Sequence, residues 1–205
     1  MDKLEFKVFV LGGLSTNCYL IFDRETKKGF LIDSPCFSKE LNEFVEDENL
    51  KIQFIALTHA HFDHIGGLGE SREFYIHKED IPLLKDASLN FSSFLNSSFT
   101  VKAQPRLYQE NTLLPFNSHN LEVIHTPGHT PGSVCLKLGK WLFSGDTIFF
   151  DSIGRTDIPG ASTDLLIKSI KEKIFPMAED IIVYPGHGPS TTIGREKKCN
   201  PFLRN

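Results

Sequence analysis

Three histidines and one aspartate lie within six residues of the chain, from His59 to His64, in the run Thr-His-Ala-His-Phe-Asp-His that begins at Thr58. Imidazole and carboxylate groups are common ligands of divalent transition metals, so this density of donors predicts a metal site. The apolar residues just before it, 52–57, predict a buried strand. Because a loop at the end of a rigid sheet can aim several side chains at one point, we expect the donors at a strand end.

Further donors follow three other predicted strands, each directly after a glycine that allows a tight turn. They are His129 in Pro-Gly-His-Thr-Pro-Gly, Asp146 in Ser-Gly-Asp-Thr and His187 in Tyr-Pro-Gly-His-Gly-Pro. With the first run they make five histidines and two aspartates, which are too many for one tetrahedral ion and suit two ions that share a carboxylate. Imidazole and carboxylate groups without a thiolate suit Zn²⁺, but also Fe²⁺ or Mn²⁺, so the ligand types alone do not select the metal.

The other histidines and the cysteines fit ordinary structural roles. His77, His119 and His125 stand outside such turns and are predicted to be surface or strand residues, although His125 is close enough to the turn at 127–129 to support it. The cysteines are scattered and form no C-x-x-C pair, which argues against a disulfide framework and a zinc ribbon. Cys36 either lies near the site or is a half-buried, small apolar residue.

The elements that must position these residues form two similar halves. Strands are predicted at 4–10, 18–22, 29–32, 52–57, 73–76, 121–125, 133–138, 141–143 and 181–184. Helices are predicted after Ser38, at 78–84, and from Thr163 to Ile174, where Pro176 stops the last one. Two strand-rich halves with helices predict an α/β fold, a four-layer αββα sandwich of two mixed β-sheets with helices outside, in a single domain over residues 1–205.

One segment, Asp86 to Gln104, is rich in serine and asparagine and carries Phe91, Phe94 and Phe99 without a regular period. A long loop inside a compact domain is often functional. One interpretation is a mobile aromatic flap over the site, in which Phe94 contacts the substrate. The other is a loop that tucks its phenylalanines into a small separate cluster.

Composition excludes several classes of partner. The formal net charge is −4, and Lys and Arg are concentrated only at 27–28 and 195–198, so we expect no nucleic-acid partner. Charged residues interrupt the first ten positions, which argues against a signal peptide, and no apolar run reaches membrane-spanning length. A cytoplasmic protein without a membrane partner is expected, and its oligomeric state is left open.

The order of the motifs, Thr-His-x-His-x-Asp-His followed by Gly-His, Gly-Asp and Gly-His turns, resembles the metallo-β-lactamase superfamily. The runs PGHTPGS, FSGDT and GRTD, and the tail at 191–194 and 200–203, are similar to its glyoxalase II-like (hydroxyacylglutathione hydrolase-like) branch. The resemblance implies one metal on His59, His61 and His129, another on Asp63, His64 and His187, and Asp146 as the bridge between them. It also implies that Asp33 supports the histidine run; alternatively, Asp33 is only a polar residue that ends a strand.

The activity implied by this resemblance is that of a metallohydrolase acting on a small-molecule thioester of the hydroxyacyl-thiol kind. A metal lowers the pKa of bound water to about 7, so that hydroxide is available for attack on the carbonyl. Asp63 is either only a ligand or also accepts the proton. Arg155 either contacts a substrate carboxylate or pairs with Asp157. Glyoxalase II has a further helical C-terminal region that contacts glutathione, whereas this sequence ends at Asn205, so glutathione recognition is not implied.

The sequence also fits two other functions. Persulfide dioxygenases of the same branch resemble these motifs, including Gly-Arg-Thr-Asp, and use one Fe²⁺ held by two histidines and one aspartate with open positions for O₂. The seven donors do not exclude that chemistry. A non-catalytic metal-binding module would be expected to have lost ligands, and none is missing here.

Overall fold

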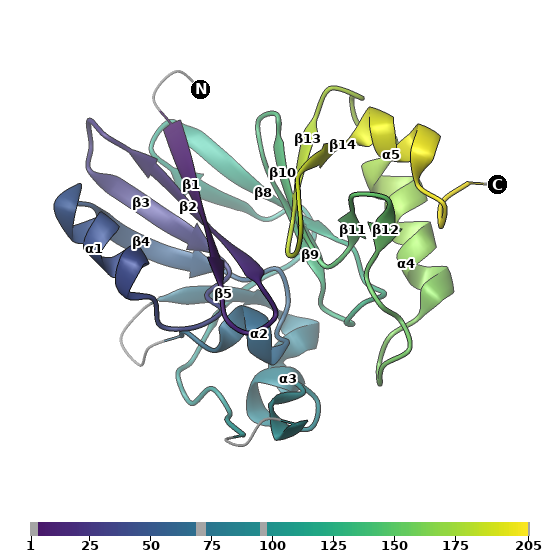
Figure 1. Ribbon diagram of the computed structural model, residues 1–205, viewed down its shortest axis with the longest axis horizontal. Helices are drawn as coiled ribbons and strands as arrows, with labels where there is room; N and C mark the ends of the chain where they lie inside the picture. The colour runs from purple at the N-terminus through teal and green to yellow at the C-terminus, as the bar shows by residue number, and fades with distance from the viewer. Residues whose placement is uncertain (1–3, 69–72, 95–97, 205) are drawn as a thin grey trace. The chain divides into compact units, whose positions relative to one another are not determined.

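The structure of the protein, a computed structural model, describes residues 4–68, 73–94 and 98–204 (Figure 1). The chain divides into two compact units. Unit 1 comprises residues up to Ile76 and residues 81–107, and unit 2 comprises the short segment 77–80 and the chain from Tyr108 onward. The single domain over residues 1–205 stays a prediction. Among the helices of the described chain, none is long and apolar enough to span a membrane.

The sheet of the N-terminal half is mixed and has six strands. Its first three strands form an antiparallel meander, and the fourth and fifth join it in parallel. A parallel pair of strands needs a crossover connection, usually a helix, that returns the chain to the end of the sheet where the previous strand began. The strands follow each other in chain order: β1 (Leu4–Leu11), β2 (Thr16–Asp23), β3 (Lys28–Ile32), β4 (Lys51–Ala56), β5 (Phe74–His77) and β6 (Arg106–Tyr108).

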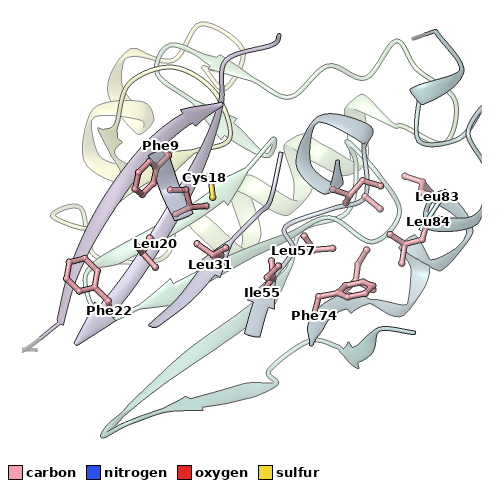
Figure 2. Packing of buried hydrophobic residues seen from close by; sticks show 14 of the residues in the cluster. Phe9, Cys18, Leu20, Phe22, Leu31, Ile55, Leu57, Phe74, Leu83 and Leu84 are labelled. Carbon is pink, nitrogen blue, oxygen red and sulfur yellow. The ribbon is translucent and has the colours of Figure 1, made fainter. Parts of the chain in front are cut away.

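Helices cover the apolar face of this sheet. Helix α1 (Lys39–Asp47) begins after Ser38, whose hydroxyl accepts a hydrogen bond from the Leu41 amide at 3.2 Å, as predicted. Helix α3 (Ile81–Lys85) contributes Leu83 and Leu84 to the same core. Figure 2 shows these leucines together with side chains of neighbouring strands, among them Leu31 and Ile55. The strand that ends at the histidine run is therefore anchored by a packed core.

Unit 2 contains a second mixed sheet of six strands. Its order is β14 (Thr191–Thr192), β13 (Ile182–Pro185), β10 (Trp141–Gly145), β9 (Val134–Leu138), β8 (His119–His125) and β7 (Leu113–Phe116). Only the pairing of β10 with β13 is parallel. A separate small hairpin, β11 (Ile148–Phe149) with β12 (Ser152–Ile153), follows β10. The segment 77–80 adds the short helix η1 (Lys78–Asp80).

The long helix predicted in the second half is present with one irregular turn. Helix α4 (Thr163–Ser169) begins after Ser162 and continues into η3 (Ile170–Ile174), a π-helical turn in which the Phe175 amide donates to the Ile170 carbonyl at 2.9 Å. Its apolar stripe, Leu166, Ile170 and Ile174, is fully buried as the spacing predicts. Helix α5 (Ile193–Cys199) was not predicted; it begins after Thr192, whose hydroxyl accepts from the Arg195 amide.

Candidate functional site

The histidine run of unit 1 leaves the end of β4, as predicted. Where the sequence suggested only a loop, the structure places Asp63 and His64 on a one-turn helix, α2 (Phe62–Ile65). The Phe62 amide donates to the Asn90 carbonyl at 2.8 Å, which fixes the start of this turn. The His59 ring centroid lies 4.8 Å from that of His61 and 4.1 Å from that of His64, so three buried imidazoles gather at one place.

Asp33 is the buried acceptor behind this run. Its Oδ2 accepts from the Thr58 hydroxyl and from His64 Nδ1, both at 2.8 Å, and its Oδ1 accepts from the Thr58 amide at 2.8 Å. Its backbone is in the left-handed region, with φ of +59°, which is uncommon for a residue that is not glycine. Asp33 thus follows β3 and also contacts the histidine run, which is the supporting position that the family resemblance implies.

These contacts determine which ring nitrogens can bind a metal. His64 Nδ1 donates to a carboxylate, which leaves the lone pair on Nε2. The Thr58 hydroxyl gives its proton to Asp33 and therefore accepts from His59 Nδ1 at 3.1 Å, which leaves the lone pair of His59 on Nε2 as well. A donating second ring nitrogen is the usual support of a histidine that ligates a metal, so these residues fit such a role.

Asp63 is tied to the first hairpin of the sheet. The Thr16 hydroxyl, at the start of β2, donates to Asp63 Oδ2 at 3.1 Å, and His64 Nε2 lies 3.6 Å from the same oxygen. Thr16 was not predicted as a site residue, because a threonine that opens a strand belongs to no recognisable motif. The contact gives the Asp63 carboxylate a fixed orientation.

Unit 2 brings its three predicted ligands together. Asp146 Oδ2 lies 3.5 Å from His129 Nε2 and 3.7 Å from His187 Nε2. His129 Nδ1 donates to the Arg155 carbonyl at 2.9 Å, so its lone pair is also on Nε2. Since metal–ligand distances are about 2 Å, these separations are short enough for Asp146 Oδ2 to share an ion with either imidazole.

Glycines make these turns possible. Gly145, before Asp146, has φ of +50°, a conformation that favours glycine. A Cβ on Gly154 would lie 1.8 Å from the Asp146 carbonyl oxygen, so the Gly-Arg-Thr-Asp run needs its glycine for close backbone approach. The Gly186 amide donates to the Gly145 carbonyl at 2.8 Å and thereby joins the turn of His187 to that of Asp146.

Arg155 pairs with Asp157, which was one of the two roles considered for it. Its Nε and one terminal nitrogen donate to the two carboxylate oxygens at 2.9 and 3.0 Å. These hydrogen bonds hold the pKa of the Asp157 carboxyl below its ordinary value. A contact between Arg155 and a substrate stays a prediction.

The segment Asp86–Gln104 combines features of both interpretations. The Phe91 ring lies 5.0 Å from the His61 ring, and Phe94, which is 81% exposed, stacks on Phe91 at 5.9 Å. Phe99, by contrast, packs against the core of unit 1. Residues 95–97 lie outside the described chain. Two aromatic rings therefore extend from a predicted metal ligand to the surface.

The other histidines lie on strands, as predicted, and the cysteines form no disulfide in the described chain. His77 stacks on His125 with ring centroids 3.9 Å apart, and His125 Nε2 donates to the Pro131 carbonyl, in the turn that follows His129. Cys36 is half-buried, and all four cysteines, which lie in the described chain, are without a disulfide. Burial raises the pKa of the Cys135 thiol to about 11, so this cysteine is a poor nucleophile at neutral pH.

Comparisons with known proteins agree with this arrangement. Residues 11–187 match the model of the metallo-beta-lactamase superfamily. The hydroxyacylglutathione hydrolase GloC of Haemophilus influenzae is 32% identical over 211 residues, covering 98% of this chain and 99% of the relative.

Two solved structures resemble the chain over nearly its whole length. The crystal structure of BLEG-1 B3 metallo-beta-lactamase matches with a TM-score of 0.90 and 40% identity, covering 98% of this chain and 100% of the other. TTHA1623 in a di-iron-bound form matches with a TM-score of 0.84 and 34% identity, covering 96% and 100%. The predicted fold class, αββα with two mixed sheets, is confirmed.

Proposed function

This chain belongs to the metallo-β-lactamase superfamily, and from that premise we propose that it hydrolyses thioesters of the 2-hydroxyacyl-thiol kind with the help of two divalent metal ions. The coarser assignment, a metal-dependent hydrolase, rests on the family and on the histidine and aspartate donors of both units. The choice of a thioester is supported by the similarity to a hydroxyacylglutathione hydrolase. Zn²⁺ is the favoured metal, with Fe²⁺ and Mn²⁺ as alternatives.

In this proposal His59, His61 and His129 hold one ion, Asp63, His64 and His187 hold the other, and Asp146 serves both. The observation that carries it is the position of Asp146 Oδ2, which lies 3.5 Å from Nε2 of His129 and 3.7 Å from Nε2 of His187. The two histidines are assigned to different ions, and one carboxylate oxygen is close to both.

Bound divalent ions would bring the pKa of water to about 7 and polarise the acyl carbonyl, which is the chemistry that thioester hydrolysis needs. The chain's own residues orient this centre. Asp33, Thr58 and the Arg155 carbonyl fix the tautomers of three histidines. Thr16 orients Asp63, whose carboxylate we assign to accept the proton of the attacking water. The exposed ring of Phe94 offers an apolar surface for the acyl or thiol part of the substrate.

Metal content and substrate profile test this proposal together. Protein purified anaerobically without added metal is analysed by elemental mass spectrometry, and it is then assayed with a 2-hydroxyacyl thioester, the matching oxygen ester and a β-lactam. We expect about two ions per chain, mostly zinc, and the highest kcat/KM with the thioester. Higher activity on the β-lactam would contradict the thioester assignment.

A second candidate is the one-iron persulfide dioxygenase. The di-iron-bound form of TTHA1623, which is 34% identical to this chain, favours iron as the metal. Because that form holds two irons, it supports the metal of this candidate and not its stoichiometry of one. One iron per chain, with O₂ consumption on a persulfide and no thioester cleavage, would support this candidate and exclude the hydrolase.

A further inference from the structure

A second buried carboxylate contacts the turn that carries His129. Asp80 ends helix η1 and its side chain is fully buried. Its Oδ2 accepts from the Thr130 hydroxyl at 2.9 Å, and its Oδ1 accepts from the Gly132 amide at 2.7 Å. The two oxygens of one carboxylate thus bind Thr130 and Gly132, which are one and three residues after His129.

The arrangement repeats that of Asp33. Each carboxylate accepts from one threonine hydroxyl and one backbone amide, and each threonine is the sequence neighbour of a predicted ligand: Thr58 precedes His59, and Thr130 follows His129. Hydrogen bonds to an ionised acceptor are roughly twice as strong as neutral ones. Two separate ligand turns, one in each unit, therefore have the same kind of buried anchor.

The other side of the turn is fixed independently. The Gly128 carbonyl accepts from the Ser162 amide at 2.8 Å, and a Cβ on Gly128 would lie 2.4 Å from Leu166 Cα, so α4 contacts the turn directly. On the far side, a Cβ on Gly132 would lie 2.6 Å from Asp80 Oδ1. His129 therefore lies between a contact with α4 and a contact with Asp80. Removal of Asp80 would leave the residues that follow His129 without their carboxylate partner.

We propose that Asp80 is a positioning residue that sets the orientation of the His129 imidazole toward its metal ion. The proposal rests on the proposed function, because it takes His129 to be a ligand. Removal of a residue that supports a metal ligand typically lowers metal affinity by about 10- to 100-fold. We expect a loss of this size when Asp80 is removed.

The test compares Asp80→Ala with Asp80→Asn in the full chain. Zn²⁺ affinity is measured by competition with a chromophoric chelator, and the coordination geometry by the absorption spectrum of the Co²⁺ form. Asp80→Ala should lower the Zn²⁺ affinity of one of the two metal sites by about 10- to 100-fold and change the Co²⁺ spectrum. Asp80→Asn should stay within about threefold of the wild type, because its amide can accept from Gly132 and donate to the Thr130 hydroxyl, which can turn to Ser133.

Glu196→Ala is the matched control. Glu196 is another fully buried carboxylate of unit 2, which accepts from the Thr191 hydroxyl and from the Asn200 amide. Its loss should lower the midpoint of thermal unfolding and leave both zinc affinities unchanged. If Asp80→Ala does not fold, Thr130→Val removes one of the two contacts without a change of size, and zinc affinity at one site should fall several-fold.

The outcomes separate the two proposals. Two zinc ions bound by the wild type, with unchanged affinities in Asp80→Ala and Thr130→Val, would overturn the role of Asp80 and leave the proposed function intact. Equal losses in Asp80→Ala and Glu196→Ala would show only a general effect of destabilisation and would also overturn it. A wild-type chain that binds no metal would instead overturn the proposed function.

Discussion

The Nδ1 atoms of His59, His64 and His129 each donate to an oxygen of the protein, and each acceptor comes from a different kind of group: a threonine hydroxyl, a carboxylate and a backbone carbonyl. Because a neutral imidazole has one donor and one acceptor nitrogen, these contacts leave the lone pair of each ring on Nε2, where it can bind a metal. The ligand chemistry of the site thus depends on residues that bind no metal themselves.

Asp33 should be the most sensitive of these acceptors. In Asp33→Asn at least one of its three hydrogen bonds is lost, since the new amide NH₂ meets groups that are themselves donors. We expect the free energy of unfolding in chelator to fall by about 2–3 kcal/mol. Urea unfolding measures this, and Asp157→Asn, at an exposed carboxylate, should change it by less than about 0.5 kcal/mol. Equal effects of the two substitutions would contradict the argument.

Asp146 should affect both ions. Since its Oδ2 is close to Nε2 of His129 and of His187, Asp146→Ala should lower the occupancy of two ions per chain in elemental analysis. The matched variant His187→Ala should deplete mainly one. If Asp146→Ala lost only one ion, Asp146 would not be a bridge.

At the scale of elements, a helix or strand could be predicted where a periodic apolar pattern is accompanied by residues that mark the beginning or the end of the element. The strand before the histidine run and the helix after Ser38 are examples, and both are present. Helix α5 was missed because its sequence, Ile-Gly-Arg-Glu-Lys-Lys-Cys, has too few apolar residues for a helical period. Strand β14 has only two residues, and α2 is a single turn, so neither leaves a periodic signal.

The candidate site shows the same division. The seven predicted ligands stand in recognisable motifs, so the sequence alone could propose them. Asp80 and Thr16 have no motif, because their partners lie 50 and 47 residues away in the chain and only the tertiary fold brings them together. Their roles could be inferred only from burial and distances.

The aromatic segment makes a prediction of its own. Phe94 is mostly exposed and touches Phe91, so Phe94→Ala should leave the metal content and the unfolding midpoint unchanged. Because an aromatic contact is worth about 0.5–1.5 kcal/mol, KM for a thioester with an apolar group should rise by about two- to tenfold. Steady-state kinetics test this, with Phe202→Ala as the control at another exposed phenylalanine. An unchanged KM would assign the segment a purely structural role.

At the scale of the whole molecule, the two units are interleaved in the sequence. The chain enters unit 2 for residues 77–80, returns to unit 1, and enters unit 2 again at Tyr108. The segment 77–80 contains His77, which stacks on His125, and Asp80, which accepts a hydrogen bond from Thr130 in the turn of His129. The stability of unit 2 therefore depends on a segment that precedes the rest of it by nearly thirty residues.

His77 makes that dependence measurable through pH. Its pKa is lowered to about 4, first by burial and then by the nearby His125 and Lys78, whereas Glu79 and Glu110 act in the opposite direction. In the unfolded chain a histidine has a pKa of about 6.5. Between these two values the unfolded chain binds a proton that the folded chain does not, so the free energy of unfolding falls as pH falls from about 6.5 to 4.

Between pH 7.5 and pH 5 the loss at this group amounts to about 2 kcal/mol. Urea unfolding in chelator at pH 7.5 and 5 measures it, because the chelator removes the pH dependence of metal binding. His77→Gln cannot titrate, so its unfolding free energy should depend less steeply on pH than that of the wild type. If His77→Gln retained the full slope, the proton uptake would belong to other groups, and the contact between the segment 77–80 and β8 would not be the acid-sensitive part of unit 2.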